Sequence, residues 1–393
     1  MPRQTSADAQ RPSHDVLIVG AGPYGLAVAL DLHRRGLRPK VFGEPFELWH
    51  RHTFDRMRLR SDVRMSSIGP YDFAAFLERR GIDPATDRIG VEAYREFLVE
   101  VADQLPFPIV RARIDQLERR GDGSFAVTVD GQAFAAPAVV VATGNGAHRY
   151  TPPVLEALPA DRVVHSWDTQ AIERWVDRRV LVVGAGQSAA EAVETLLAQG
   201  QRSLRWALRH PMLFFREPLR APTPIFKVML AVSPALYKLP RAVRAGLQRA
   251  CFRTTVTPDL RPVYDDPRVE KIFVDAEGLA LEAVEGPDGF ELRSGWDDAR
   301  YDVVVSATGF RYSVAGLPFL SAGLREALGG AAALPPLDDD FQSAVPGLYL
   351  IGGIAEGTFG PAQRFLLGSR HAAKRVGRAL AARAGVSADR LAA

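Results

Sequence analysis

The chain has 393 residues, of which 47% are hydrophobic and 24% are charged, and its formal net charge is +3. This length favours two domains, the composition is typical of a soluble globular protein, and the small net charge gives no sign of a nucleic-acid partner. Cys251 is the only cysteine, which excludes internal disulfides, a C-x-x-C redox pair and a cysteine-rich metal site. The histidines have no zinc-ligand spacing, so we expect no metal.

The N-terminal segment, residues 1–14, is polar and lacks the apolar core of a signal peptide, so we predict a disordered arm. No later run approaches the roughly 18 apolar residues that are needed to span a bilayer. We therefore expect a cytoplasmic protein without a transmembrane segment.

The apolar run of residues 16–19 is followed directly by the sequence GAGPYG at residues 20–25. A buried strand, a G-x-G-x-x-G turn and a helix form the phosphate-binding start of a dinucleotide-binding domain. In such a turn Gly20 permits the tight bend, Gly22 lets the diphosphate approach the backbone, and Gly25 lets helix and strand pack closely. The diphosphate would lie at the N-terminus of the following helix.

An acidic residue near the end of the next strand, predicted over residues 38–42, should bind the adenosine ribose of this first nucleotide. Glu44 lies close to the expected spacing of about 20 residues after the glycines. Glu47 is the competing candidate, and we prefer Glu44.

The same signature occurs a second time, as GAGQSA at residues 184–189 after the apolar run of residues 180–183. Gly184 and Gly186 take the positions of the first two glycines, and alanine in the last position is an allowed variant. A strand is predicted next, over residues 203–208. Two copies of the signature imply two dinucleotides in one chain.

Basic residues follow this second strand where an acidic residue would select NAD. Arg205, Arg209 and His210 are the candidates. A cation at this position can bind a 2′-phosphate, so we expect NADPH, with Arg209 as the preferred ligand. The alternative is that these residues form a solvated strand end.

A longer repeat supports the pairing of the two signatures. Residues 114–144 and 281–309 each contain an Asp-Gly hairpin signal, alternating apolar residues and a buried strand that ends in Ala-Thr-Gly. The glycine after such a strand lets the chain turn tightly beside a nucleotide. We predict an α/β fold with two Rossmann-like domains, in which a second domain, 158–315, is inserted into a first, 15–157 and 316–385.

Residues 211–263 do not fit this scheme, because they are rich in proline, aromatic and basic residues. We predict a helical insertion that packs on the core. A substrate lid and a membrane-surface helix, which would give a peripheral membrane contact, are the alternatives.

Taken together, GAGPYG, GAGQSA, the paired Ala-Thr-Gly strands and Ala-Thr-Gly-Phe at residues 307–310 resemble the class B flavoprotein monooxygenases. That family includes flavin-containing monooxygenases, Baeyer–Villiger enzymes and lysine/ornithine N-hydroxylases. Further stretches, 41–49, 57–61 and 359–365, are similar to bacterial relatives described as FAD-dependent oxidoreductases. The resemblance covers nearly the whole chain.

The resemblance implies FAD in the first site and NADPH in the second. NADPH would reduce the flavin, and the reduced flavin would capture O2 as a C4a-(hydro)peroxide that oxygenates a small-molecule substrate. The cofactor-binding residues expected on this basis are Gly20, Gly22, Pro23, Tyr24, Gly25, Glu44, Trp49, Thr143, Gly144, Gly184, Gly186, Gln187, Ser188, Arg209, Thr308, Gly309, Gly353 and Phe359.

Three departures from the family pattern bear on catalysis. His165 lacks the expected Phe and Gly before it, so it has either a linker role or a structural one. Flavin-containing monooxygenases place an asparagine near the flavin, whereas the matching stretch here offers Arg60 and Ser61, which we expect on the nicotinamide side. The late Gly-Asp of many two-nucleotide flavoproteins is missing, and backbone N–H groups of residues 353–359 would replace it.

We therefore expect an NADPH- and O2-dependent monooxygenase that N- or C-hydroxylates a small molecule. A reductase that passes electrons to a quinone or ferredoxin is the alternative, and a non-catalytic NADPH-binding protein is a third reading. The single cysteine speaks against a disulfide as the electron acceptor. The sequence leaves the substrate and the oligomeric state open.

Overall fold

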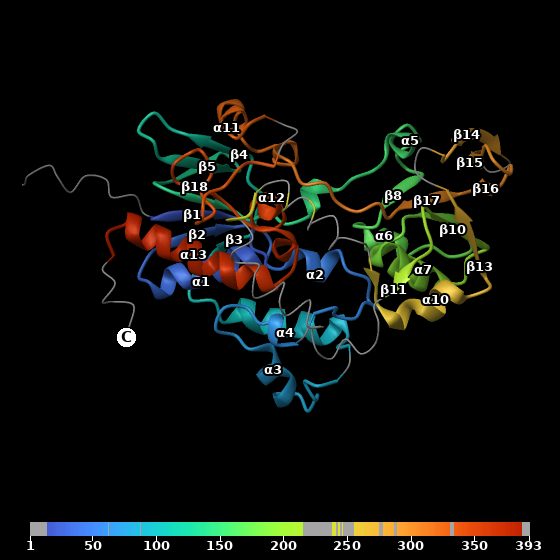
Figure 1. Ribbon diagram of the computed structural model, residues 1–393, viewed down its shortest axis with the longest axis horizontal. Coiled ribbons are helices and arrows are strands. Elements are labelled where there is room, and N and C mark those ends of the chain that lie inside the picture. The colour runs from blue at the N-terminus through green and yellow to red at the C-terminus, as the bar shows by residue number, and fades with distance from the viewer. Residues whose placement is uncertain are drawn as a thin grey trace, which may run out of the picture.

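The chain forms two lobes in a computed structural model (Figure 1). The structure describes residues 14–61, 63–86, 88–214, 238–240, 243, 246, 255–274, 278–286, 289–330 and 334–386. The predicted N-terminal arm and most of the predicted insertion at 211–263 lie outside these residues. Among the described helices, none is long and apolar enough to cross a membrane.

The first lobe is built on a parallel sheet of five strands in the order β18-β7-β1-β2-β3. Its strands are β1 (Val16–Val19), β2 (Pro39–Phe42), β3 (Ile109–Val110), β7 (Val139–Val141) and β18 (Leu348–Leu350). Val19 pairs with Phe42 on one side and with Val141 on the other. The loops after β1, β2 and β7 therefore leave the sheet at the same edge.

Both faces of this sheet are covered, which explains why β1 is apolar at every position. Val16 and Ile18 belong to the core under α1 (Pro23–Arg34) and α13 (Leu367–Arg383). Leu17 and Val19 face the opposite core, under a small antiparallel sheet. That sheet consists of β4 (Gln116–Arg119), β5 (Phe125–Val129) and β6 (Gln132–Ala136).

The second lobe repeats this plan with a parallel sheet in the order β13-β10-β9-β17-β8. Its strands are β8 (Val163–His165), β9 (Arg179–Val183), β10 (Ser203–Leu208), β13 (Val269–Phe273) and β17 (Val303–Ser306). Helix α7 (Gln187–Gln199) packs on one face. Val183 pairs with Ala207 and with Ser306, so the strand ends align as in the first lobe.

The predicted internal repeat is present in three dimensions. The strands predicted over 38–42 and 203–208 are β2 and β10, and the predicted hairpin at 122–123 joins β4 to β5. The second hairpin joins β14 (Leu281–Gly286) to β15 (Gly289–Ser294), which pairs with β16 (Arg300–Tyr301). Each antiparallel sheet leads into an interior strand of the parallel sheet, β7 or β17. The α/β fold class is confirmed.

The first lobe also contains a pair of helices, α3 (Phe73–Arg79) and α4 (Val91–Asp103), whose rings of Phe73 and Tyr94 belong to an aromatic cluster. The remaining elements are short. They are α2 (Glu47–Arg51), η1 (Val63–Met65), η2 (Gly146–His148), α5 (Pro153–Glu156), α6 (Thr169–Ile172), β11 (Leu213–Phe214), β12 (Thr255–Val256), η4 (Pro258–Leu260), α10 (Arg261–Asp265), η5 (Val314–Gly316), α11 (Ala322–Ala327), η6 (Gly353–Ala355), α12 (Glu356–Phe359) and η7 (Pro361–Arg364).

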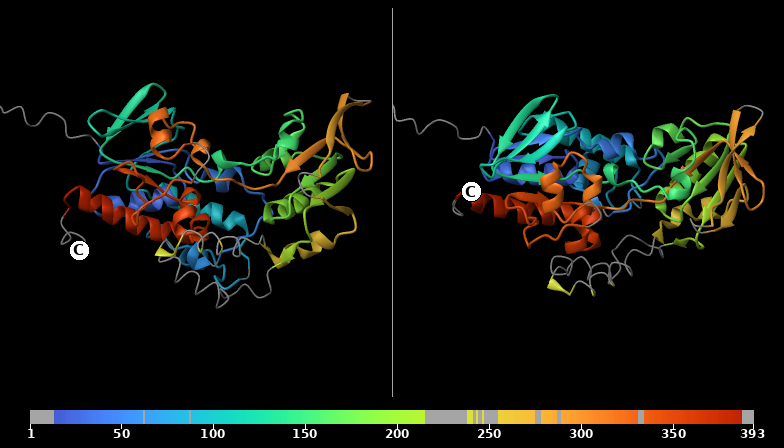
Figure 2. Two further views of the ribbon diagram at one scale, coloured as in Figure 1. Left: turned by 45° about the horizontal axis from the view of Figure 1, so that its top comes forward. Right: turned by 90° about the horizontal axis from the view of Figure 1, so that it is seen from above.

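Two connections join the lobes, one after β7 and one after β17 (Figure 2). They run antiparallel and are hydrogen-bonded to each other. The N–H of Tyr150 donates to the carbonyl of Gly309 at 3.0 Å, and the N–H of Arg311 donates to the carbonyl of His148 at 2.8 Å. The two connections thus form a paired hinge beside the carboxyl edges of both sheets.

Candidate functional site

The first glycine signature forms an open cradle at the start of α1. Gly20 has φ +117°, and a Cβ there would lie 2.3 Å from the carbonyl oxygen of Ala142. A Cβ on Gly25 would lie 1.9 Å from the carbonyl oxygen of Gly20, so both glycines are required by packing. A Cβ on Gly22 would meet nothing within 4 Å, and no side chain caps the helix. The uncapped N-terminus and the open space at Gly22 fit a bound diphosphate.

The second signature has the same geometry at the start of α7. Gly184 has φ +147°, and a Cβ there would lie 2.3 Å from the carbonyl oxygen of Ala307. Gly186 is the N-cap residue of α7, and no side chain caps this helix either. In each lobe the first glycine therefore packs on the alanine of the Ala-Thr-Gly turn. Gly144 and Gly309, which end these turns, have φ +67° and +86° with open space around them.

Two acidic residues follow β2 at this edge, as predicted. Glu44 lies 3.8 Å from the guanidinium of Arg111, and its side chain is 35% exposed. Glu47 accepts a hydrogen bond of 3.0 Å from Arg113. Both carboxylates have an arginine neighbour, so the ion pairs alone do not separate the two candidates for the ribose.

Arg205 in β10 and Arg209 directly after it differ sharply in their surroundings. Arg205 is held by Glu270, Asp297 and Tyr301, with 2.5 Å to the carboxylate of Asp297, and this engagement raises the pKa of Arg205. Arg209 is exposed directly after the strand and has no hydrogen-bond or ion-pair partner among the described residues. Of these two arginines, Arg209 is the one whose charge has no partner among the described residues and is available to a ligand.

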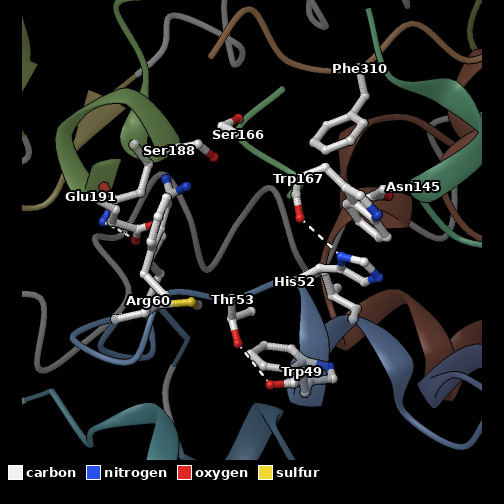
Figure 3. Close-up of a pocket in the computed structure, with 14 residues that line it drawn as sticks. Trp49, His52, Thr53, Arg60, Asn145, Ser166, Trp167, Ser188, Glu191 and Phe310 are labelled. Atoms are coloured by element: carbon white, nitrogen blue, oxygen red, sulfur yellow. Dashed lines mark hydrogen bonds between the residues drawn. The ribbon is translucent and has the colours of Figure 1, made fainter. Parts of the chain in front are cut away.

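A pocket lies between the two lobes, at the carboxyl edges of both sheets (Figure 3). The first lobe contributes residues from α2, the segment after it and the loop after β7. The second lobe contributes residues from the ends of β8 and β17 and from the first turns of α7. The lining residues are Leu48, Trp49, His52, Thr53, Phe54, Met57, Arg60, Asn145, Ser166, Trp167, Gln187, Ser188, Glu191 and Phe310.

One end of this pocket is aromatic. The rings of His52 and Trp167 stack at 4.2 Å with 20° between their planes, and Phe310 meets Trp167 edge-on at 5.9 Å. The indole Nε1 of Trp49 is buried and has no hydrogen-bond partner among the described residues. An unpaired buried donor is costly, so this N–H fits a ligand that supplies an acceptor.

The other end of the pocket is charged. Figure 3 shows Arg60, Ser188 and Glu191 close together, away from the labelled aromatic rings. Burial raises the pKa of Glu191 from 4.5 to about 7, although the hydrogen bond from Gln187 and the charge of Arg60 act in the opposite direction. A carboxyl group that titrates near neutrality therefore faces an arginine of the other lobe.

Several predicted cofactor-binding side chains form hydrogen bonds within the protein. The hydroxyl of Tyr24 donates to the carbonyl of Phe365 at 2.8 Å, and that of Thr308 donates to the carbonyl of Tyr150 at 2.5 Å. The amide of Gln187 donates to Glu191 at 2.9 Å, and its oxygen accepts from the N–H of residue 257 at 3.0 Å. At these positions the side-chain donors are engaged within the protein.

The predicted catalytic residues do not all line the pocket. Arg60 lines the pocket, whereas Ser61 does not. His165 is buried at the end of β8, where its Nδ1 accepts from the N–H of Trp167 at 3.0 Å and its Nε2 lies 3.1 Å from the carbonyl of Gly309. Since Nδ1 accepts, Nε2 must carry the proton, and burial lowers the pKa of this neutral imidazole. His165 thus ties β8 to the hinge.

Two predicted cofactor-binding residues near the C-terminus, Gly353 and Phe359, have packing roles in the structure. The ring of Phe359 is buried and stacks on Phe341 at 3.8 Å, so it belongs to the core. A Cβ on Gly353 would come within 2.1 Å of the ring of Tyr312, which is why a glycine is needed there. Pro23 begins α1, and Thr143 follows β7 at the edge of the first cradle.

The predicted site residues include four of the fourteen lining residues, so ten were missed, and the five of these that matter for the chemistry of the pocket are His52, Asn145, Trp167, Glu191 and Phe310. Asn145 and Phe310 each follow directly after an Ala-Thr-Gly turn. That shared position could have identified both as site residues, because each Ala-Thr-Gly turn packs on the first glycine of a cradle. The other three carry no motif.

The N-terminal half of the chain, which holds parts of both lobes, matches a described family, and curated relatives also match the chain in part. Residues 17–213, half of the chain, match pyridine nucleotide-disulphide oxidoreductase. The probable indole-3-pyruvate monooxygenase YUCCA9 of Arabidopsis thaliana is 30% identical over 188 residues, 44% of this chain and 42% of that protein. The ferredoxin--NADP reductase of Nitrobacter winogradskyi is 27% identical over 186 residues, 45% of this chain and 47% of that protein. The matches thus span less than half of these relatives.

The whole fold is shared with a solved structure. The reduced form of ornithine hydroxylase from Pseudomonas aeruginosa has a TM-score of 0.75 and 20% identity, with 93% of this chain and 98% of that chain covered. The expected resemblance to flavoprotein monooxygenases is thereby confirmed at the level of the fold. With its two glycine cradles and its match over half the sequence, the chain belongs to the pyridine nucleotide-disulphide oxidoreductase family.

Proposed function

We propose that this protein is an FAD-dependent, NADPH-consuming monooxygenase that hydroxylates a small molecule at nitrogen or carbon. The observation that carries the proposal is that two dinucleotide cradles pack on Ala-Thr-Gly turns whose following residues, Asn145 and Phe310, line one pocket between the lobes. Two such cradles suit a path for electrons from one nucleotide to another. The similarity to an indole-3-pyruvate monooxygenase and to the fold of an ornithine hydroxylase supports the same reaction class.

In this proposal the residues of the first lobe hold FAD. The N-terminus of α1 binds the diphosphate over Gly22, and Glu44 binds the ribose. The unpaired Nε1–H of Trp49 offers a donor where the cofactor and the pocket meet. When bound, the flavin supplies hydride acceptance and the activation of O2.

The residues of the second lobe hold NADPH. The N-terminus of α7, with Gly186 and Ser188, receives the diphosphate, and Arg209 pairs with the 2′-phosphate. Arg60 adds a cation from the other lobe. In the overall reaction one oxygen atom of O2 enters the substrate and the other leaves as water, while NADPH supplies two electrons.

A reductase that passes electrons from NAD(P)H to ferredoxin or a quinone is the second candidate. It is favoured by the similarity to a ferredoxin--NADP reductase. A disulfide is a poor candidate for the acceptor, because the chain has one cysteine and a dithiol mechanism needs two. The domain division at 158 and 315 and a membrane contact through 211–263 stay predictions.

The test is NADPH oxidation by the purified yellow protein in an oxygen electrode. Candidate substrates are ornithine, lysine and indole-3-pyruvate, with ferredoxin and a soluble quinone in parallel. We expect one of the small molecules to raise O2 uptake while the yield of hydrogen peroxide falls. Fast reduction of ferredoxin or quinone without oxygen would instead favour the reductase.

A further inference from the structure

The loop after β7 carries an asparagine at the interlobe pocket. Asn145 follows the Ala-Thr-Gly turn of the first lobe and lines the pocket. Its amide oxygen accepts a hydrogen bond of 2.6 Å from the hydroxyl of Tyr312. None of the described residues accepts a hydrogen bond from its amide nitrogen. What Asn145 has left to offer a ligand is therefore its NH2 donor.

Tyr312 keeps this amide in one orientation. Burial raises the pKa of Tyr312 to about 12, so the hydroxyl stays protonated and donates. Its ring packs directly on Gly353, and the guanidinium of Arg364 lies 5.0 Å from the ring centre. A donor fixed on one side of the amide draws the oxygen to that side and leaves the nitrogen for the other.

The part of the pocket around Asn145 suits a flat ring. Figure 3 shows Asn145 beside Trp167, with Phe310 above and His52 below. Ser188, in the first turn of α7, lines the same pocket. A ligand whose phosphates bind at α7 and whose ring enters the pocket would thus meet aromatic faces and one amide donor.

We propose that Asn145, oriented by Tyr312, donates a hydrogen bond to the carboxamide oxygen of the nicotinamide ring and thereby holds that ring in one orientation. This inference rests on the proposed function, since it requires NADPH to enter this pocket. Asn145 acts here as a positioning residue and takes no part in hydride transfer. The carboxamide oxygen is a strong hydrogen-bond acceptor, and a sulfur atom in its place is a weak one. The contact therefore predicts that the protein binds a nicotinamide with this oxygen more tightly than an analogue with sulfur.

Titration calorimetry on the FAD-loaded protein tests this contact with three ligands. They are NADP+, its thionicotinamide analogue, which lacks the oxygen, and its acetylpyridine analogue, which keeps the oxygen. We expect the wild type to bind NADP+ and the acetylpyridine analogue about three- to tenfold more tightly than the thionicotinamide analogue. Asn145→Ala and Asn145→Asp should remove this preference, because neither side chain can donate.

Tyr312→Phe provides the second arm, because it keeps the ring against Gly353 and removes only the hydroxyl. It should weaken NADP+ binding in the wild-type background and have no further effect after Asn145→Ala, since both changes act on one contact. FAD content and melting temperature of each variant control for folding. An unchanged oxygen-over-sulfur preference in Asn145→Ala, or additive effects of the two changes, would overturn the inference alone. A wild type that binds no NADP+ would overturn the proposed function with it.

Discussion

Removing the charge of Glu191 should stabilise the protein at alkaline pH. This carboxyl is 8% exposed, and its pKa is raised from 4.5 to about 7 chiefly by burial. Because the folded state holds the proton more tightly than the unfolded chain, this group favours folding below about pH 4.5. That contribution is lost as the pH rises toward 7.

The size of the effect follows from the two pKa values. The difference between 4.5 and about 7 corresponds to about 3 kcal/mol in the free energy of unfolding. Glu191→Gln is neutral at every pH and keeps an oxygen that can accept from Gln187. The variant should therefore exceed the wild type by about 3 kcal/mol at pH 8, and by less than about 1 kcal/mol at pH 5.

The assay is urea unfolding of both proteins at pH 5 and pH 8, followed by circular dichroism. Glu78→Gln, at an exposed position of α3, controls for the loss of one carboxylate. Groups other than Glu191 titrate in both proteins and cancel in the comparison. If Glu191→Gln were the less stable protein at pH 8, an ionised Glu191 paired with Arg60 would be stabilising, and the reasoning from burial would be wrong.

Three further tests concern the proposed cofactor sites, and two of them include a control substitution. Gly22→Val should give a folded protein without FAD, because the valine side chain enters open space that the diphosphate needs. Gly20→Ala should instead impair folding, because its Cβ would lie 2.3 Å from a backbone oxygen. Absorbance at the flavin band and the melting temperature distinguish these two effects, and a yellow Gly22→Val protein would contradict the assignment. Arg209→Ala should raise KM for NADPH about tenfold or more and leave KM for NADH unchanged. Arg205→Ala, which breaks an internal ion-pair network, should lower stability and leave the ratio of the two KM values unchanged. Trp49→Phe keeps an aromatic ring and removes the unpaired donor, so FAD should dissociate about two- to tenfold more readily by fluorescence titration; equal affinity would show that Nε1 does not contact the cofactor.

Much of the fold could be predicted because each signature is local. A buried strand, a glycine turn and a helix follow one another within the chain, and parallel pairing then places their ends at one edge. The position of Gly20 against Ala142, and of Gly184 against Ala307, follows from this register. The paired Ala-Thr-Gly turns were a sequence sign of the same contact.

The direction of individual side chains could not be predicted in this way. The glycine signature specifies backbone geometry, and it says nothing of where the side chains between the glycines point. Tyr24 and Gln187 lie within the two signatures, yet their polar atoms bond to Phe365 and to Glu191. These partners are determined by tertiary packing.

The pocket also could not be predicted from the sequence, because its lining depends on how the two lobes pack against each other. Trp167 and His52 stack across the lobes although they lie far apart in the chain. The hinge that sets their distance is held by backbone hydrogen bonds, such as the one from Tyr150 to Gly309, which any residue type could form. No residue pattern marks such a contact.

The most direct test of the account follows the oxygen atoms. The FAD-loaded protein is given NADPH, a candidate substrate and isotopically heavy O2, and the product is analysed by mass spectrometry. The account predicts a hydroxylated product that carries one heavy oxygen atom, formed only when NADPH is present. Product oxygen derived from water, or rapid NADPH oxidation with electrons delivered only to ferredoxin or quinone, would contradict it.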